Sequence, residues 1–353
     1  MIAERETTAA RRCYDLDPAL RALAACDDRG VPLAGRDAET AALRRAGARN
    51  PSLGRIFEGH LNGVQLVARC GTPEQRAAAS DDIASGRLFG VWNTHDEDDR
   101  LRIERHAGGL RLRGGKTWAS GAGSIGRPIV TGAWPDGSVQ MIVLRMDEIA
   151  ARIDPSDWRP LGMHDSDSFR VGFDGVVVES RDLLGAPGEY ERQPWFLGGA
   201  LRFAAVQTGI VERLYAASVA YLCERGRAED AFQTARVAEM KIALHTAGHW
   251  LAVGAAAWRA FDAEPTDASA AELLDVVDMA RTVVERVALD VIERAVRSVG
   301  ARGLIEPAPF AGLVRDLQMY LRQPAPDAAL LRVGRAAFAA SGGPHPAAPF
   351  ARI

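Results

Sequence analysis

The stretch with the clearest chemical potential is KTWASGAG, residues 116–123, which sets a tryptophan and a serine two positions apart. Trp118 offers a flat aromatic face, and the hydroxyl of Ser120 can donate or accept a hydrogen bond. The small residues that follow leave backbone groups exposed beside these two side chains. Such a strand end suits either an ordinary sheet corner or contact with a flat, polar ligand.

The composition is that of a globular chain. Its 353 residues are 47% hydrophobic and 25% charged, with a formal net charge of -3. This balance gives no argument for a nucleic-acid or membrane-surface partner. No segment approaches the roughly 18 uninterrupted apolar residues of a membrane span, and the N-terminus lacks the apolar region of a secretory signal. We therefore expect a cytoplasmic protein with no membrane partner.

The four cysteines are scattered, without a CxxC pair or other metal-ligand spacing. We expect reduced thiols and no metal site. The cysteines are Cys13, Cys26, Cys70 and Cys223.

The spacing of apolar residues changes twice along the chain. Residues from about 17 to 85 show helical spacing, and His60 lies on the apolar face of one of these helices. Residues from about 87 to 184 form short alternating runs, including a hairpin that turns at Gly108–Gly109. From about residue 195 onward, long alanine-rich helices predict a bundle.

Several segments, in this order, resemble the motifs of one family. KTWAS is similar to a strand motif G-x-K-x-W-I-T/S, and LGMHDSDSFRVGF, residues 161–173, is similar to L-G-x-R-x-S-x-T followed by V-F-D. VGARGL, residues 299–304, followed by Arg315 and Asp316, is similar to Q-x-x-G-G-x-G…R-D. From about residue 20 to 340 the chain therefore resembles the acyl-CoA dehydrogenase superfamily of flavoproteins.

The resemblance implies an α+β fold in three domains. These are an N-terminal helical domain at residues 1–86, a middle β-barrel domain at residues 87–188 and a C-terminal four-helix bundle at residues 189–353. It also implies FAD held between the middle sheet and the bundle, in a homodimer or homotetramer.

The resemblance further assigns residues to the cofactor. Trp118 takes the place of a tryptophan that packs by the isoalloxazine ring, and Ser120 that of a hydroxyl at its reactive edge. Thr94 takes the place of a threonine that contacts the flavin, with a strand-end hydroxyl capping its own turn as the alternative. Pyrophosphate contacts fall to arginines and glycines, for which a surface arginine and a helix C-cap turn are the alternatives. These positions are Arg225, Arg297, Gly300 and Gly303.

The catalytic base of the dehydrogenases has no counterpart at the family's two places for it. Removal of an α-proton requires a nearby carboxylate. One of these places holds Gln323 and Pro324, and the other holds Gly199 and Ala200. Asp327 lies near the first place in sequence, but we expect it to cap the following helix.

A second branch of the superfamily, the flavin monooxygenases that oxidise aromatic or sulfur heterocycles, shares other features. RIFEGHLNG contains His60 in the manner of that branch's F-G-x-H, and KTWASGAG contains its S-G-A. In that branch a histidine and a hydroxyl manage protons at the flavin. A hydrogen-bonded core histidine is the alternative for His60, and that branch's C-terminal catalytic histidine is missing from the end segment.

The sequence thus predicts an FAD-dependent oxidoreductase of the acyl-CoA dehydrogenase type. It would transfer hydride to FAD from a small-molecule substrate that is an acyl thioester, such as an acyl-CoA, or is acyl-like. The alternatives are a two-component flavin monooxygenase and a flavin-free binding or assembly protein. The catalytic residues are unidentified, with His60 and Ser120 as the candidates.

Overall fold

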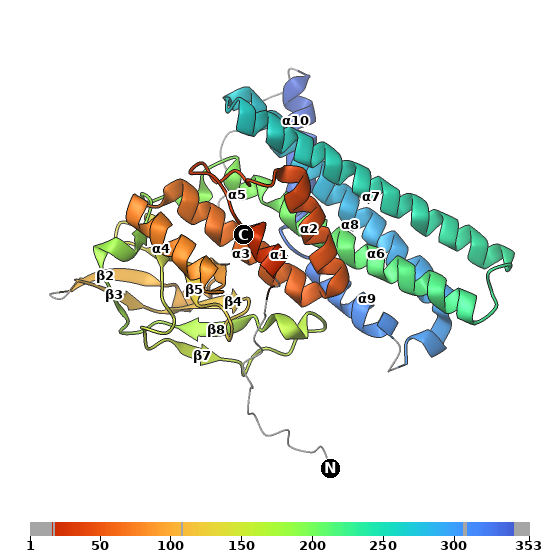
Figure 1. Cartoon of the computed structure of the whole chain (residues 1–353), viewed down its shortest axis with the longest axis horizontal. Coiled ribbons are helices and arrows are strands. Elements are labelled where there is room, and N and C mark those ends of the chain that lie inside the picture. Colours follow the sequence, from red (N-terminus) through yellow and green to blue (C-terminus); the bar gives the residue numbers. More distant parts are fainter. Residues whose placement is uncertain (1–15, 17, 107–108, 306–308, 342–353) are drawn as a thin grey trace, which may run out of the picture. The chain divides into compact units, whose positions relative to one another are not determined.

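The computed structural model describes residues 16, 18–106, 109–305 and 309–341 (Figure 1), and the chain divides into two compact units. The first, called the β unit, comprises the chain up to Leu33, Gly59–Arg159 and Asp165–Tyr190. The second, called the helical unit, comprises Ala34–Glu58, Pro160–His164 and the chain from Glu191 onward. The boundaries expected at residues 86 and 188 stay a prediction.

The strands of the β unit form two sheets. The larger has the order β10-β6-β5-β2-β3-β9, with β1 paired to β5, and the smaller has the order β4-β8-β7. The strands are β1 (Phe89–Trp92), β2 (Arg102–His106), β3 (Gly109–Arg113), β4 (Gly115–Ala119), β5 (Arg127–Ala133), β6 (Val139–Val143), β7 (Arg152–Asp154), β8 (Phe169–Gly172), β9 (Val177–Val178) and β10 (Leu183–Leu184).

The hairpin read from the sequence is confirmed by the antiparallel pairing of β2 with β3. Ile103 pairs with Leu112, and both side chains are buried, as period-two alternation requires. Gly108, expected in the turn, lies outside the described residues. Short 3-10 helices lie between strands at Glu97–Asp99, His164–Ser166 and Ser180–Asp182, and another follows β10 at Glu189–Glu191.

Among the helices ahead of the strands, α4 (Pro73–Ala84) begins with a local capping motif. The N-cap of α4 is Thr72, whose side chain accepts from the Gln75 backbone N–H. In return, the Gln75 side-chain oxygen accepts from the Thr72 backbone N–H. This capping box satisfies two otherwise unpaired backbone donors. The others are α1 (Pro18–Ala22), α2 (Arg36–Arg49) and α3 (Pro51–Cys70), which contributes residues to both units.

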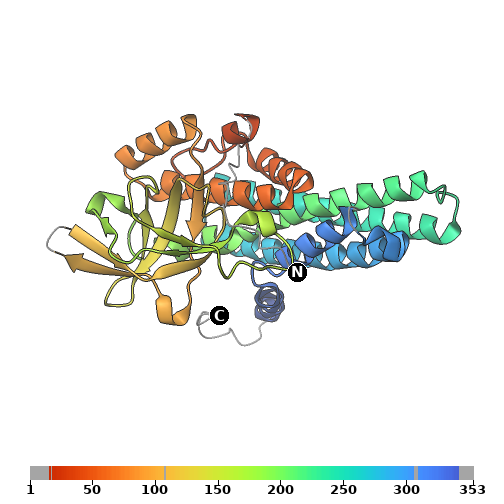
Figure 2. The same ribbon diagram turned by 90° about the horizontal axis from the view of Figure 1, so that it is seen from below.

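The helical unit is a bundle in which α8 packs against α6, α7, α9 and α10. Figures 1 and 2 show α6, α7 and α8 as long neighbouring helices. The helices are α5 (Trp195–Gly198), α6 (Ala200–Glu224), α7 (Ala231–Ala263), α8 (Asp267–Gly303), α9 (Pro309–Tyr320) and α10 (Pro326–Ala340). The α+β fold class predicted from the sequence is confirmed.

Glycine allows α2 and α6 to touch backbone to backbone. A Cβ added at Gly209 would lie 1.9 Å from the Arg44 carbonyl oxygen, and one added at Gly47 would lie 2.3 Å from the Val206 carbonyl oxygen. Because no side chain fits at either position, α2 is held tightly on the bundle.

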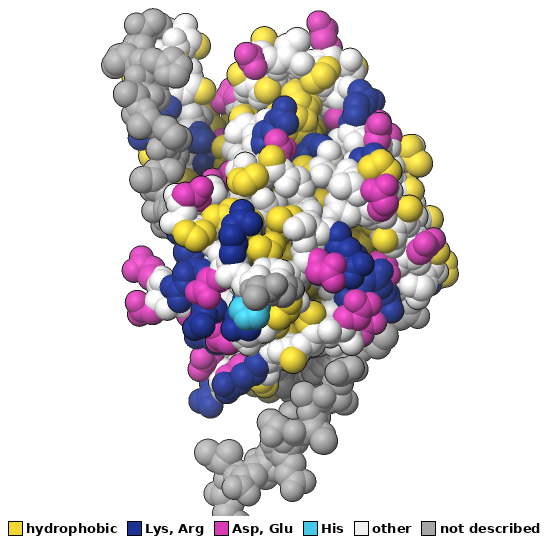
Figure 3. All heavy atoms as spheres, turned by 90° about the vertical axis from the view of Figure 1, so that its left-hand side faces the viewer, with side chains coloured by type: hydrophobic (Ala, Val, Ile, Leu, Met, Phe, Trp, Pro, Cys, Tyr) yellow, Lys and Arg dark blue, Asp and Glu magenta, His cyan; other side chains and the backbone are white. Residues whose placement is uncertain are grey.

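The surface charges are mixed in sign, as the near-neutral composition predicts. On the face shown in Figure 3, basic and acidic side chains are interspersed and neither sign forms a continuous patch. No helix in the described part of the chain is both long enough and apolar enough to cross a membrane. The described cysteines, Cys26, Cys70 and Cys223, are free thiols, and Cys13 lies outside the described residues.

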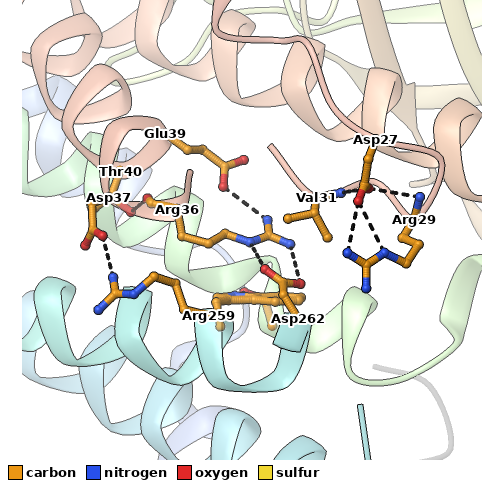
Figure 4. Close-up of polar contacts among 11 residues, drawn as sticks. Asp27, Arg29, Val31, Arg36, Asp37, Glu39, Thr40, Arg259 and Asp262 are labelled. Atoms are coloured by element: carbon orange, nitrogen blue, oxygen red, sulfur yellow. Dashed lines mark hydrogen bonds and ion pairs between the residues drawn. The ribbon is translucent and has the colours of Figure 1, made fainter. Parts of the chain in front are cut away.

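A buried arginine fastens α2 to α7 (Figure 4). Arg36 donates to both carboxylate oxygens of Asp262, at 2.8 and 3.0 Å, and to Glu39 at 3.2 Å. Its guanidinium also lies 4.4 Å from the centre of the Trp258 ring. Close by, exposed Arg259 pairs with exposed Asp37, so the two ion pairs of buried Arg36 lie beside an exposed one.

We expect Arg36→Met to lower the free energy of unfolding by about 3–5 kcal/mol, because it leaves buried carboxylates without their cation. Arg259→Met is the matched control and should cost at most about 1 kcal/mol, since exposed pairs contribute little. Urea unfolding of both variants measures the difference. Equal losses would show that burial of the Arg36 pair does not matter.

Candidate functional site

Trp118 lies where the pairing of β4 with β8 slips by one residue. Lys116 pairs with Val171 but Ala119 pairs with Phe169, so three steps along β4 match two along β8. This β-bulge gives Trp118 a left-handed backbone, with φ of 54°. A bulky residue is rarely found there, and the conformation costs about 1–3 kcal/mol. The fold therefore holds this tryptophan in a strained backbone.

The bulge also reverses the direction of the indole. In a regular strand Lys116 and Trp118 would face the same side. Lys116 is instead 1% exposed and Trp118 is 47% exposed. The ring of Trp158 meets the Trp118 indole edge-on, with centroids 5.6 Å apart and planes at 89°. The β unit thus presents a partly exposed indole whose orientation a second indole supports.

Ser120 follows the bulge and is held at its backbone. Its N–H donates to the Trp118 carbonyl at 2.8 Å, and its own carbonyl accepts from the indole N–H of Trp92 at 3.0 Å. Its Oγ lies 2.9 Å from the Oγ of Ser168, which lies 2.9 Å from the Oγ of Ser166. Ser166 and Ser168 were not predicted as site residues, although both belong to the segment that resembles L-G-x-R-x-S-x-T.

Thr94 lies beside the same strand. It follows β1 and is exposed, and its carbonyl accepts from the Thr117 N–H at 3.0 Å. Thr94, Trp118 and Ser120, three of the predicted cofactor contacts, are therefore brought together by β1 and β4. Their role as cofactor contacts stays a prediction.

Buried Lys116 stabilises this arrangement from inside. Its Nζ donates to the Asn93 carbonyl at 3.0 Å and to Thr131 Oγ1 at 2.9 Å, and Thr131 donates to the Asn93 side chain at 2.6 Å. Both acceptors are neutral, so burial lowers the pKa of Lys116 to about 7, with a smaller contribution from Arg100. The lysine joins the end of β1 to β4 directly behind Thr94 and Trp118.

His60 lies in the core of the β unit. Its Nδ1 accepts from the Phe89 N–H at 3.1 Å, so in the neutral ring Nε2 carries the hydrogen. Nε2 has no hydrogen-bond partner among the described residues. Burial, with a smaller contribution from Arg21, lowers the pKa of His60 to about 4. A neutral imidazole with one open donor results, and its role in catalysis stays a prediction.

The candidate phosphate contacts lie at the ends of α6 and α8. Arg225 lies 4.8 Å from the centre of the Tyr221 ring, and the Tyr221 hydroxyl donates to the Val299 carbonyl at 3.4 Å. α8 breaks at the next residue, Gly300, which has φ of 62° and open space where a Cβ would be. The structure therefore brings Arg225 close to the Gly300 turn.

The other two candidates are engaged locally. Arg297 forms an exposed ion pair with Glu293 on the preceding turn of α8. Gly303 is buried, and a Cβ there would lie 2.4 Å from the Cβ of Val299. Close packing explains this glycine without a ligand, whereas the helix break at Gly300 has no such explanation.

The first place for a dehydrogenase base is a rigid turn. Fully buried Arg281 donates to the carbonyls of Pro324 and Leu321 at 3.0 and 2.6 Å, and Gln207 donates to that of Gln323 at 2.9 Å. The expectation that Asp327 caps α10 is wrong, because Ala325 is the N-cap and Asp327 lies in the first turn. There its charge favours the helix N-terminus.

Carboxylates from other helices approach both places, and each is already engaged by two arginines. Glu285 accepts from Arg281 at 2.9 Å and from Arg322 at 2.8 Å. Near the start of α6, Glu58 accepts from Arg55 at 2.8 Å and from Arg202 at 3.2 Å. Either carboxylate would have to leave two guanidinium groups to act as a base.

Comparison with known proteins agrees with this fold. Residues 201–321 match the family described as acyl-CoA dehydrogenase, C-terminal domain. A dibenzothiophene monooxygenase of Rhodococcus erythropolis is 28% identical over 297 residues, and the match covers 74% of this chain and 70% of that protein.

Two solved structures share the fold at low sequence identity. A dibenzothiophene monooxygenase from a Paenibacillus species, solved with FMN and indole, has a TM-score of 0.83 at 21% identity, covering 93% of this chain and 89% of that one. Butyryl-CoA dehydrogenase of Megasphaera elsdenii has a TM-score of 0.72 at 18% identity, covering 84% and 80%.

The strain at Trp118 predicts an unusual order of stability for two variants. We expect Trp118→Gly to be more stable than Trp118→Ala by up to about 1 kcal/mol, because glycine alone adopts the left-handed region without steric cost. At an ordinary strand position alanine is the more stable residue. Denaturant unfolding of both variants decides, and alanine equal to or above glycine would contradict the strained backbone.

The depressed pKa of Lys116 predicts a pH-dependent stability. Between about pH 7 and 10 the unfolded chain keeps the lysine proton that the folded chain releases, so stability rises with pH by up to about 1.4 kcal/mol per unit. Below pH 7 both states are protonated and this contribution is flat. In Lys116→Met the rise should disappear, and an unchanged slope would show that Lys116 titrates normally. Unfolding at several pH values measures it.

Proposed function

Because residues 201–321 match the acyl-CoA dehydrogenase C-terminal domain family and the fold is shared with enzymes of that type, we propose that the chain is a two-component flavin monooxygenase acting on a small molecule. The 28% sequence identity to the Rhodococcus dibenzothiophene monooxygenase supports this reaction class. Aromatic or sulfur heterocycles are the proposed substrates. The resemblance to the superfamily also leads us to propose that the chain forms a homodimer or homotetramer.

The state of the two base positions is the observation that carries the proposal. An acyl-CoA dehydrogenase needs a free carboxylate to remove the α-proton. Here the two base positions hold Gly199–Ala200 and Gln323–Pro324. Buried Arg281 fixes the turn at Gln323–Pro324 by donating to backbone carbonyls. The approaching carboxylates, Glu58 and Glu285, are each engaged by two arginines. Oxygen transfer requires no such base.

The residues of the β unit fit a flavin ring. A flavin needs an apolar face beside its ring and hydrogen-bonding groups at its polar edge. Trp118 would supply the face, while Ser120 and exposed Thr94 would supply the hydrogen bonds. When bound, reduced flavin supplies the electrons that activate oxygen.

Ser120, rather than His60, is the proposed proton-handling contact. The His60 ring is fully buried and bonded to the Phe89 backbone, and its lowered pKa leaves it neutral near pH 7. Ser120 lies close to partly exposed Trp118 in the chain, and hydrogen bonds of its backbone N–H and carbonyl fix its backbone. His60 then serves to hold the start of β1.

We propose FMN as the flavin, in place of the FAD expected from the sequence. The Paenibacillus enzyme of the same fold was solved with FMN. In this chain Arg297 replaces the family's glutamine and pairs with Glu293, and Ala301 replaces one of its glycines. Both changes fall at positions that the resemblance assigns to the pyrophosphate of FAD. Arg225 and Gly300 remain the proposed phosphate contacts.

We expect the purified protein to bind FMN at least tenfold more tightly than FAD, measured by quenching of flavin fluorescence. Trp118→Ala should weaken FMN binding at least tenfold, because the indole covers the ring. Trp134→Ala, which removes another tryptophan of the β unit, should leave binding unchanged. Tighter FAD binding would restore the original cofactor prediction, and no flavin binding would favour the flavin-free alternative.

The reaction class is tested with the same preparation. With NADH, FMN and a flavin reductase, we expect dibenzothiophene or indole to be converted to an oxygenated product that carries label from ¹⁸O₂. Anaerobic mixing of the flavin-loaded protein with acyl-CoAs should not bleach the flavin. Bleaching by any acyl-CoA would overturn the proposal in favour of the dehydrogenase.

A further inference from the structure

We propose that Trp158 is a positioning residue for the flavin, which fixes the Trp118 indole in the orientation that receives the ring. The inference rests on the proposed function and deepens it, because it adds a residue that lies outside the matched sequence motifs. Trp158 acts through Trp118 in this scheme and not on the flavin itself.

The bulge fixes the backbone of Trp118 but does not by itself fix the indole. The backbone has φ of 54°, whereas the residue is 47% exposed. An exposed side chain with two rotatable bonds populates several rotamers, and a flat ligand would have to select one of them. Each such restriction lowers affinity, so a contact that selects the rotamer in advance strengthens binding.

Trp158 supplies that contact in a geometry that leaves room for a ligand. The two ring centroids are 5.6 Å apart and the planes meet at 89°, which is the edge-to-face arrangement that aromatic pairs favour. Two rings at right angles touch through one edge and one face, so at least one face of the Trp118 indole stays uncovered by Trp158. The contact therefore orients the indole without closing it to a flat ring.

A short turn after β7 presents the Trp158 indole. The Trp158 N–H donates to the Pro155 carbonyl at 3.1 Å, which closes this turn. β7 and β4 are the two neighbours of β8, and Gly172 of β8 pairs with Arg152 on one side and with Gly115 on the other. One indole comes from β4 and the other from the turn after β7, so the pairing of both strands with β8 sets the distance between them.

A purely structural role for Trp158 makes a different prediction from a positioning role. Trp158 is partly exposed, and in a structural role its loss would cost stability without changing how the Trp118 indole is held. The positioning role requires that the effect of Trp158 on flavin binding disappears when Trp118 is absent. A double-mutant cycle between the two residues therefore separates the roles.

The orientation of the pair is measured first, without flavin. Two indoles in contact couple their electronic transitions and produce paired bands of opposite sign in the far-ultraviolet circular dichroism spectrum. We expect these bands in the wild-type spectrum minus that of Trp158→Phe, and also in the wild-type spectrum minus that of Trp118→Phe. Trp134→Phe is the control and should keep the bands, because the Trp134 ring contacts the Arg105 guanidinium, 5.6 Å from the ring centre.

The affinity for FMN is then compared across the cycle by quenching of flavin fluorescence. We expect Trp158→Ala to weaken FMN binding about fivefold, the effect of losing one aromatic contact. In the Trp118→Ala background the same substitution should have no further effect. Trp158→Phe keeps an aromatic ring and should bind FMN within about twofold of the wild type. Thermal unfolding without flavin reports whether each variant is folded.

The outcomes are distinct. An equal loss from Trp158→Ala in both backgrounds, no loss with Trp118 present, or paired bands that persist in Trp158→Phe would overturn the positioning role while leaving the proposed function intact. Absence of FMN binding in the wild-type protein would overturn both. If Trp158→Ala fails to fold, Trp158→Leu takes its place in the cycle, and equal losses in the two backgrounds would again contradict the role.

Discussion

The extra residue that β4 carries opposite β8 decides where three chemically important side chains point. It buries Lys116, turns Trp118 outward and sets Ser120 beside Ser168. Without it the period of two would place Lys116 and Trp118 on one face, and one of them would be in the wrong environment. The strained backbone of Trp118 is thus the condition for having both a packed interior and an accessible indole.

That strain persists because the surrounding contacts outweigh it. The Lys116 ammonium bonds to Asn93 and Thr131 behind the bulge, and the Trp92 indole holds the Ser120 carbonyl in front of it. Burying a lysine with neutral partners is itself unfavourable, as its lowered pKa shows. The strained backbone of Trp118 and the buried charge of Lys116 are both unfavourable for stability, and they lie two residues apart. This concentration is typical of sites selected for function over stability.

Local patterns predicted much of the fold, and pairing over long distances explains what they missed. The capping box at Thr72 and the hairpin of β2 and β3 depend on residues a few positions apart, so the sequence shows them directly. The bulge at Trp118 depends on register with a strand about fifty residues later, which alternation within β4 does not reveal. Ser168 and Arg281 were missed for the same reason: their partners, Ser120 and the turn after α9, are distant in sequence.

The proposed ring contacts and the two base positions come from different parts of the chain. The proposed ring contacts come from β1, β4 and the loops that follow them, in the β unit. The two base positions lie at the start of α6 and after α9, in the helical unit. Because different elements supply them, the turn at Gln323 can be rebuilt around Arg281 without altering the register of β4 with β8. Trp118 and Ser120 can therefore keep their positions whatever residues occupy the two base positions, because the two sets are structurally independent.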